Sequence, residues 1–68
     1  MLYWASAIVQ DESDKKPWHL AISDGMEKLE YAVEAIHFIR TNHKVLSAWI
    51  DTFDDDNIKR TIFHECYL

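Results

Sequence analysis

The residues best suited to chemistry lie near the carboxyl end of the chain, where His64, Glu65 and Cys66 are consecutive. On an extended strand His64 and Cys66 point to the same side, as two ligands of a metal ion could. A zinc site needs two further ligands, and the other three histidines show no ligand spacing. The same imidazole and thiol could be a base and a nucleophile, but neighbours on a strand rarely form the required hydrogen bond. We therefore expect ordinary half-buried residues here, with no metal, cofactor or catalytic group.

The acidic run DTFDDDN, residues 51–57, has carboxylates that invite comparison with a calcium-binding loop. With Asp54 as the first ligand, Asp56 and Glu65 take the third and twelfth positions. The fifth and sixth positions then hold Ile58 and Lys59, where an oxygen ligand and a glycine are required. The run is instead typical of a solvated turn, since Asp and Asn side chains bond turn backbone and tolerate left-handed geometry.

Composition limits the classes of function that the chain can have. Its 68 residues carry a net charge of −5, and 49% of them are hydrophobic. The negative charge disfavours nucleic acids and anionic membrane surfaces, and no apolar run is long enough to span a bilayer. The N-terminus lacks the pattern of a signal peptide, and the single Cys66 allows no intrachain disulfide, which fits a reducing cytoplasm. We expect residues 1–68 to form one cytoplasmic domain with apolar surface left over for self-association or a partner.

A helix over Asp24–Asn42 is the clearest predicted element. Apolar residues recur every three or four positions along it: Met26, Leu29, Val33, Ile36 and Ile39. Asp24 and Glu27 fit a capping box, with Ser23 as the alternative cap, and Asn42 fits a left-handed end. Tyr31 and Phe38, seven residues apart, form a second, aromatic flank.

Strand patterns flank this helix at residues 2–10, 18–23, 44–53 and 59–68. The charged loop 11–16 joins the first pair of strands, and the acidic turn 54–57 joins the second pair. The order predicts an α+β, two-layer ββαββ fold, in which one helix packs across one face of a four-stranded antiparallel sheet. Alternation assigns the following residues to the helix side: Leu20, Ile22, Leu46, Ala48 and Ile50.

The opposite face of the sheet is predicted to be aromatic, although such a face is normally polar. Alternation assigns to it Trp49, Phe53, Phe63 and Tyr67, among Asp51, Thr61, Glu65 and His19. Trp4 joins them only if the first strand is turned that way, and a register shift of one residue would bury these rings in the core instead. We expect a homodimer that stacks sheet on sheet, with Trp49, Phe63, Tyr67 and Trp4 as its partner-binding residues. A groove for another protein or a flat ligand is the second use.

Two other functions are compatible with the sequence. An enzyme or ligand-binding module could form its site at the dimer seam from His19, Asp51 and Glu65. An acidic inhibitor could imitate a row of phosphates with Asp11, Glu12, Asp14, Glu27, Glu30, Glu34 and Asp54–Asp56. Four basic residues interrupt that row: Lys15, Lys16, Lys28 and Arg40. The favoured hypothesis remains a small protein-interaction or regulatory module without catalytic activity, whose partner is a second copy or another protein.

Overall fold

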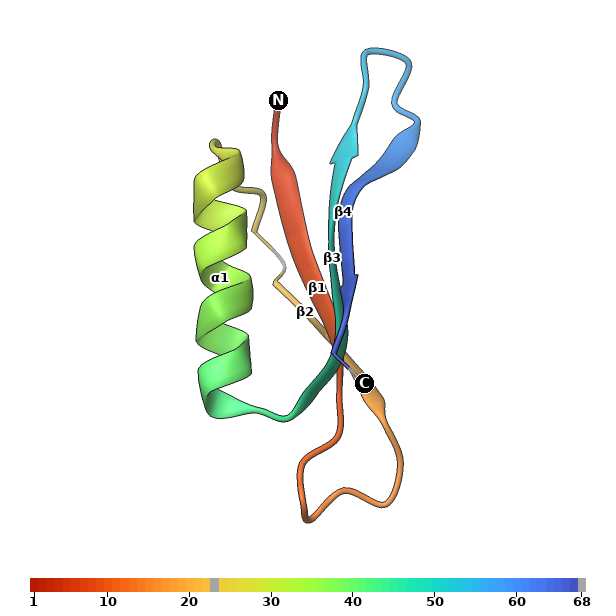
Figure 1. Ribbon diagram of the computed structural model, residues 1–68. Coiled ribbons are helices and arrows are strands. Elements are labelled where there is room, and N and C mark those ends of the chain that lie inside the picture. Colours follow the sequence, from red (N-terminus) through yellow and green to blue (C-terminus); the bar gives the residue numbers. More distant parts are fainter. Residues whose placement is uncertain (23, 68) are drawn as a thin grey trace.

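The computed structural model describes residues 1–22 and 24–67 and confirms the predicted α+β fold (Figure 1). Its elements are β1 (Tyr3–Val9), β2 (Trp18–Ala21), α1 (Leu29–Asn42), β3 (Val45–Phe53) and β4 (Lys59–Cys66). The four strands form one sheet in the order β2-β1-β3-β4, and every neighbouring pair is antiparallel. The helix lies across one face of this sheet, as the alternation of apolar residues predicted (Figure 1).

The core lies between α1 and the two central strands. Its buried residues are Ala5, Ala7, Val9, Ala32, Ile36, Ile39, Val45, Ala48 and Ile50. Alanines meet at its centre, where Ala7 of β1 pairs with Ala48 of β3 and neither is exposed. Small side chains at the contact let a helix approach a sheet closely. The helix α1 packs on the two central strands, β1 and β3, and not on β4.

The helix begins later than the sequence predicted, at Leu29 rather than at Asp24. Met26 is extended and pairs with Tyr3, because each backbone N–H donates to the other residue's carbonyl, at 2.9 and 2.8 Å. This pairing prolongs the sheet edge beyond the end of β2, so Asp24 and Glu27 cannot form the predicted capping box. Lys28 occupies the N-cap position without a side-chain hydrogen bond. Ser23, the alternative cap, lies outside the described residues.

The helix ends at Asn42, as predicted, but not through a left-handed residue. His43 continues in an extended conformation, with φ of −142°, and its N–H donates to the carbonyl of Ile39 at 2.8 Å. The amide of Asn42 instead donates to the carbonyl of Phe38 at 2.9 Å, within the last turn. The prediction of a left-handed Asn42 is therefore wrong, since Asn57 is the only non-glycine residue with a positive φ in the described part of the chain.

The acidic run after β3 is a turn, as the sequence predicted. Oδ1 of Asp54 accepts the backbone N–H groups of Asp56 and Ile58, each at 3.0 Å. Asn57 adopts φ of 63°, the left-handed region that asparagine tolerates. The carboxylate of Asp54 is thus used to build the turn that joins β3 to β4.

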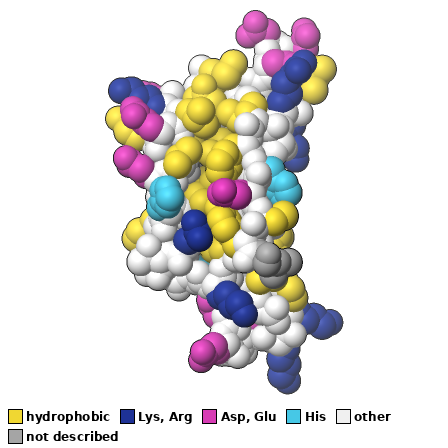
Figure 2. All heavy atoms as spheres, viewed as in Figure 1, with side chains coloured by type: hydrophobic (Ala, Val, Ile, Leu, Met, Phe, Trp, Pro, Cys, Tyr) yellow, Lys and Arg dark blue, Asp and Glu magenta, His cyan; other side chains and the backbone are white. Residues whose placement is uncertain are grey.

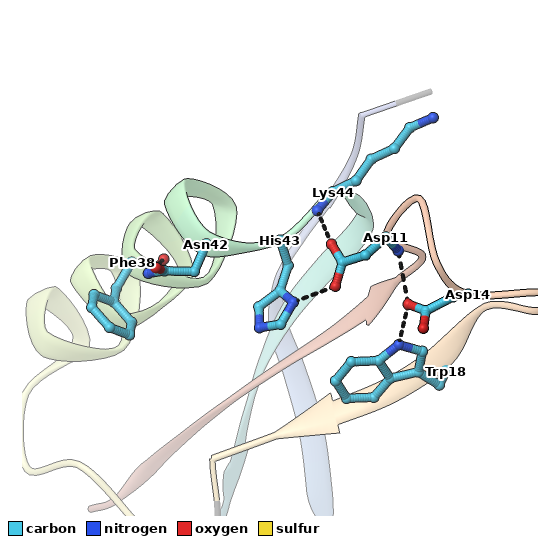
Figure 3. Close-up of polar contacts among 7 residues, drawn as sticks. All are labelled: Asp11, Asp14, Trp18, Phe38, Asn42, His43 and Lys44. Atoms are coloured by element: carbon cyan, nitrogen blue, oxygen red, sulfur yellow. Dashed lines mark hydrogen bonds and ion pairs between the residues drawn. The ribbon is translucent and has the colours of Figure 1, made fainter.

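A polar network ties the loop between β1 and β2 to the end of the helix (Figure 3). Nδ1 of His43 lies 2.7 Å from Oδ2 of Asp11 and donates to it, since an ionised carboxylate can only accept. The other oxygen of Asp11 accepts the backbone N–H of Lys44 at 2.9 Å. Oδ2 of Asp14 accepts both the N–H of Asp11 and the indole N–H of Trp18, each at 2.8 Å. The bonds of Asp11 to His43 and Lys44 join residues distant in sequence and hold the loop against the segment that enters β3.

The predicted face assignment of β4 is wrong beyond Thr61. After the turn, Phe53 pairs with Lys59, Thr52 with Arg60 and Asp51 with Thr61. The next residue of β3, Ile50, pairs with Phe63 and not with Ile62. Ile62 is therefore an extra residue, a β-bulge, and the alternation along β4 reverses at this point. Phe63, Glu65 and Tyr67 consequently face the helix side, and His64 and Cys66 face the other side.

Phe63 and Tyr67 lie at the margin of the core, and Arg40 of α1 reaches the ring of Tyr67. Both pack partly buried against the core cluster, and the guanidinium of Arg40 lies 3.9 Å from the centre of the Tyr67 ring. Burial, and then the hydrogen bond from its hydroxyl to Glu65, raise the pKa of Tyr67. In the space-filling view hydrophobic side chains remain visible in a strip between α1 and the strands (Figure 2).

A second irregularity, between β1 and β3, changes one core position. Ile8 pairs with Ser47 but Val9 pairs with Val45, so Leu46 is the extra residue. Val45 is therefore in the core, and the predicted core residue Leu46 is only half-buried. The other predicted helix-side residues, Ile22 included, lie in the core or against it.

Candidate interaction surface

No second layer from residues 1–22 and 24–67 covers the side of the sheet opposite α1, and we call this side the open face. Because directly paired residues share a face, the register gives its members. They are Trp4, Ser6 and Ile8 of β1, His19 and Ala21 of β2, Ser47, Trp49, Asp51 and Phe53 of β3, and Lys59, Thr61, His64 and Cys66 of β4.

Trp49 lies at the centre of the open face, between two histidines. Its ring is stacked on that of His19, with centroids 5.3 Å apart and planes at 14°, and lies 6.5 Å from the ring of His64. Since β1 separates β2 from β3, the indole must cross β1 to reach His19. Ser6, which pairs with Trp49 on β1, is only 7% exposed. Its small side chain leaves room for the indole to lie flat over the sheet.

Asp51 fixes the orientation of this indole. Its Oδ2 accepts the indole N–H of Trp49 at 3.1 Å, and its Oδ1 accepts the hydroxyl of Thr61 at 2.7 Å. Asp51 is 7% exposed, and a buried carboxylate is costly unless it is hydrogen-bonded in this way. Both oxygens are thus engaged by neighbours, so Asp51 acts as a clamp for Trp49.

Trp4 and Phe53 form a second aromatic pair towards one end of the open face. Their ring centroids lie 5.2 Å apart and their planes meet at 86°, an edge-to-face contact that aromatic pairs favour. Gly25 packs on the same indole, since a Cβ there would lie 3.0 Å from Cζ2 of Trp4. Phe53 remains 39% exposed, so this end presents apolar surface to solvent.

The structure brings together two of the four residues predicted to bind a partner. Trp4 and Trp49 share the open face, whereas Phe63 and Tyr67 lie on the helix side. His64 pairs with Trp49 on the open face, where the predicted alternation had placed Phe63, Glu65 and Tyr67 instead. No signal in the sequence marks the bulge at Ile62, because residues on either side of it alternate normally.

The residues proposed for a catalytic or ligand site are not assembled in one chain. His19 and Asp51 lie on the open face, but Glu65 faces the helix side, where one of its oxygens accepts the hydroxyl of Tyr67 at 2.8 Å. Among residues 1–22 and 24–67 no three His, Cys, Asp or Glu side chains lie close enough to hold a metal ion. The same described residues enclose no pocket, and their helix, α1, is not long and apolar enough to cross a membrane.

Acidic side chains are distributed over several parts of an elongated molecule. The loop 11–16 and the turn 54–57 lie at its opposite ends, with α1 between them (Figure 1). On the strands of the open face, within the described part of the chain, Asp51 is the only carboxylate. The open face is therefore much less acidic than the rest of the molecule.

Comparison of the chain with models of protein families, with curated proteins and with solved structures finds no match. Any function of the open face is therefore inferred from the chemistry of its own residues.

Proposed function

We propose that this chain is a small protein-interaction module that acts as a homodimer, in which two open faces stack sheet on sheet. The observation that carries the proposal is that two tryptophans lie on the open face, which no second layer of the described residues covers: Trp49 is stacked on His19, and Trp4 packs edge-to-face on Phe53. Tryptophan is among the residues that contribute most to binding at protein interfaces. Two sheets stacked about 10 Å apart would enclose these rings in a second apolar core.

Charge makes the open face the most favourable surface through which a second copy could bind. The chain carries a net charge of −5, so two copies repel each other over most of their surfaces. The open face adds little to this repulsion, because its described strands carry one carboxylate, on Asp51, and one ammonium group, on Lys59. A two-fold axis through the face would bring the same aromatic residues together from both copies.

The size of the open face suits a specific interface. A standard interface covers roughly 800 Å² per partner, about a sixth of the 4967 Å² of accessible surface of this chain. At about 3.3 Å per residue and about 4.8 Å between strands, the four strands span roughly 440 Å² in projection, and the relief of the side chains enlarges this area. A chain of 68 residues has a small core, so apolar burial between copies would add to its stability.

Sedimentation velocity between about 1 and 100 µM, the range of many weak dimers, tests the proposal. We expect the wild-type chain to be dimeric at the upper end, and Trp49→Asp to be monomeric because it would bury two charges in the interface. Phe38→Asp is the matched control, since Phe38 is 69% exposed on α1, away from the open face. Circular dichroism verifies that both variants are folded. A wild-type chain that stays monomeric throughout would refute the proposal.

A further inference from the structure

The aromatic flank of α1 lies on the helix side of the molecule, so stacking of two open faces would leave it in water (Figure 1). We propose that this flank, formed by Tyr31, Glu34, Ala35 and Phe38, binds an arginine-bearing segment of another protein. This function is separate from self-association, because α1 and the open face lie on opposite sides of the sheet and both can be occupied at once.

Two aromatic side chains are exposed on this flank, on Tyr31 and Phe38. Phe38 is 69% exposed, more than any other aromatic side chain in the described part of the chain. Its ring projects from α1 and lies apart from the polar network around His43 (Figure 3). Single exposed apolar residues are common on protein surfaces, so the neighbours of these rings decide what the flank can bind.

Helical spacing places Glu34 and Ala35 between the two rings. Tyr31 and Phe38 are seven residues apart, about 10.5 Å along the helix axis, and Glu34 and Ala35 are three or four residues from each of them. Helical side chains lean towards the N-terminus, so Phe38 leans over the turn that holds Glu34 and Ala35. Ala35 is partly buried and carries only a methyl group. Little side chain therefore fills the surface between the rings, and a carboxylate lies at its edge.

The charge of this flank favours a cation. Glu34 is exposed and forms no ion pair with the residues that the structure describes. The one nearby ammonium group, on Lys28, lies 3.9 Å from Glu30 and 5.7 Å from the ring centre of Tyr31. Residues 24–38 contain four acidic side chains and one basic side chain, a net charge of −3. A cationic partner is therefore attracted both by the flank and by the whole chain.

Arginine is the side chain whose chemistry fits all of these features. Its methylene stem can cover Ala35, its planar guanidinium stacks on aromatic rings, and the same group pairs with a carboxylate through two hydrogen bonds. Lysine carries a point charge, which matches the ring and the carboxylate less well. The chain itself contains this combination once, on the other flank of α1. There the guanidinium of Arg40 lies 3.9 Å from the ring centre of Tyr67, whose hydroxyl donates to Glu65.

A second copy of the chain is a poor occupant of this flank. The chain has only two arginines, and both are engaged by its own side chains. Arg40 is stacked on Tyr67, and Arg60 lies 2.9 Å from a carboxylate oxygen of Asp54. A second copy also brings a net charge of −5. The partner is therefore a different protein, which presents an arginine beside apolar residues.

Fluorescence anisotropy at 0.15 M salt with three labelled peptides tests the inference. The first peptide is built from arginine, leucine and glycine, the second has lysine in place of arginine, and the third has citrulline, which keeps the planar end of arginine without its charge. We expect the arginine peptide to bind, the lysine peptide to bind several-fold more weakly, and the citrulline peptide to bind at least about tenfold more weakly.

Variants of the chain assign the binding to this flank. Phe38→Ala and Glu34→Gln should each raise the Kd of the arginine peptide about three- to fivefold, the effect of one exposed cation–π contact or ion pair. Leu29→Ala is the control for the ring, because Leu29 lies nine residues from Phe38, about two and a half turns, and so on the opposite flank. Asp55→Asn, in the turn after β3, makes the same change in net charge as Glu34→Gln. Both controls should keep the wild-type Kd.

Three results would overturn the inference. The first is no binding of the arginine peptide up to about 1 mM. The second is a lysine or citrulline peptide that binds as tightly as the arginine peptide, because the guanidinium would then not be recognised. The third is a loss of affinity in Leu29→Ala or Asp55→Asn as large as that in Phe38→Ala or Glu34→Gln.

Sedimentation of the same variants separates this inference from the proposed function. Phe38→Ala should keep the oligomeric state of the wild-type chain. If it lost self-association, the flank would belong to a contact between copies, and the inference would fall. A wild-type chain that is monomeric throughout but binds the arginine peptide would refute the proposed dimer and support this inference.

Discussion

Asp51 is the residue whose side chain organises the open face. Its two oxygens hold the indole of Trp49 and the hydroxyl of Thr61, and each of these donors comes from a different part of the hairpin β3–β4. The sequence could indicate that Asp51 lies among aromatics, but not that it accepts from Trp49, two residues away on the same strand. That contact depends on the side-chain conformations of both residues.

Asp51→Ala should destabilise the fold by about 2 kcal/mol, because it removes the acceptor of two partly buried donors. Thr61→Val removes one of these bonds and should cost about 1 kcal/mol. Urea unfolding of monomeric protein, at low concentration, measures both. Equal losses in the two variants would show that the bond to Trp49 adds nothing to stability.

Asp11 should make stability depend on acid pH. Its pKa is lowered from 3.8, first by the hydrogen bond from His43 and then by the backbone N–H of Lys44. A carboxyl whose folded pKa lies below its unfolded value contributes stability above that unfolded value, and the contribution is lost as pH falls through the folded pKa. Wild-type protein should therefore lose more stability than Asp11→Asn below about pH 4.

Urea midpoints between pH 6 and pH 3 measure this difference, and Glu12→Gln in the same loop is the matched control. The pKa of Asp54 is also lowered, first by the N–H of Ile58 and then by Arg60. Asp11→Asn should therefore reduce the acid dependence without abolishing it. The same acid dependence in Asp11→Asn and wild type would mean that the network around His43 does not stabilise the fold.

At the scale of the elements, α1 has one buried side and one aromatic flank in water. Ile36 is buried against the sheet, whereas Phe38, two residues on, is 69% exposed. We expect Ile36→Ala to cost about 2–4 kcal/mol and Phe38→Ala to change stability by less than about 0.5 kcal/mol. Thermal and urea unfolding compare the two. A large loss in Phe38→Ala would mean that its ring packs against something outside this chain.

The order of the elements could be predicted from periodicity, but two of their details could not. The register of β4 depends on a bulge at Ile62, and the start of α1 depends on the pairing of Met26 with Tyr3. Met26 fits the helical pattern equally well, so its position is decided by backbone bonds to a distant strand. Tertiary contacts of this kind leave no local pattern in a sequence.

At the scale of the whole molecule, self-association should make thermal stability depend on concentration. If the folded chain dimerises and the unfolded chain does not, mass action raises Tm as the protein concentration rises. We expect such a rise for wild-type protein between about 5 and 200 µM, and no rise for Trp49→Asp. Scanning fluorimetry measures it. A wild-type Tm that is constant over this range would count against the dimer.

The bulge at Ile62 also affects which assemblies the chain can form. A sheet with two free edges can grow by adding strands at either side, and such growth has no natural end. Here one edge is the irregular strand β4, and the other is the four-residue strand β2, which follows Pro17. Both are features that hinder strand addition. The proposed association through the open face would, by contrast, close after two copies, so this sheet is suited to a finite assembly rather than to a growing one.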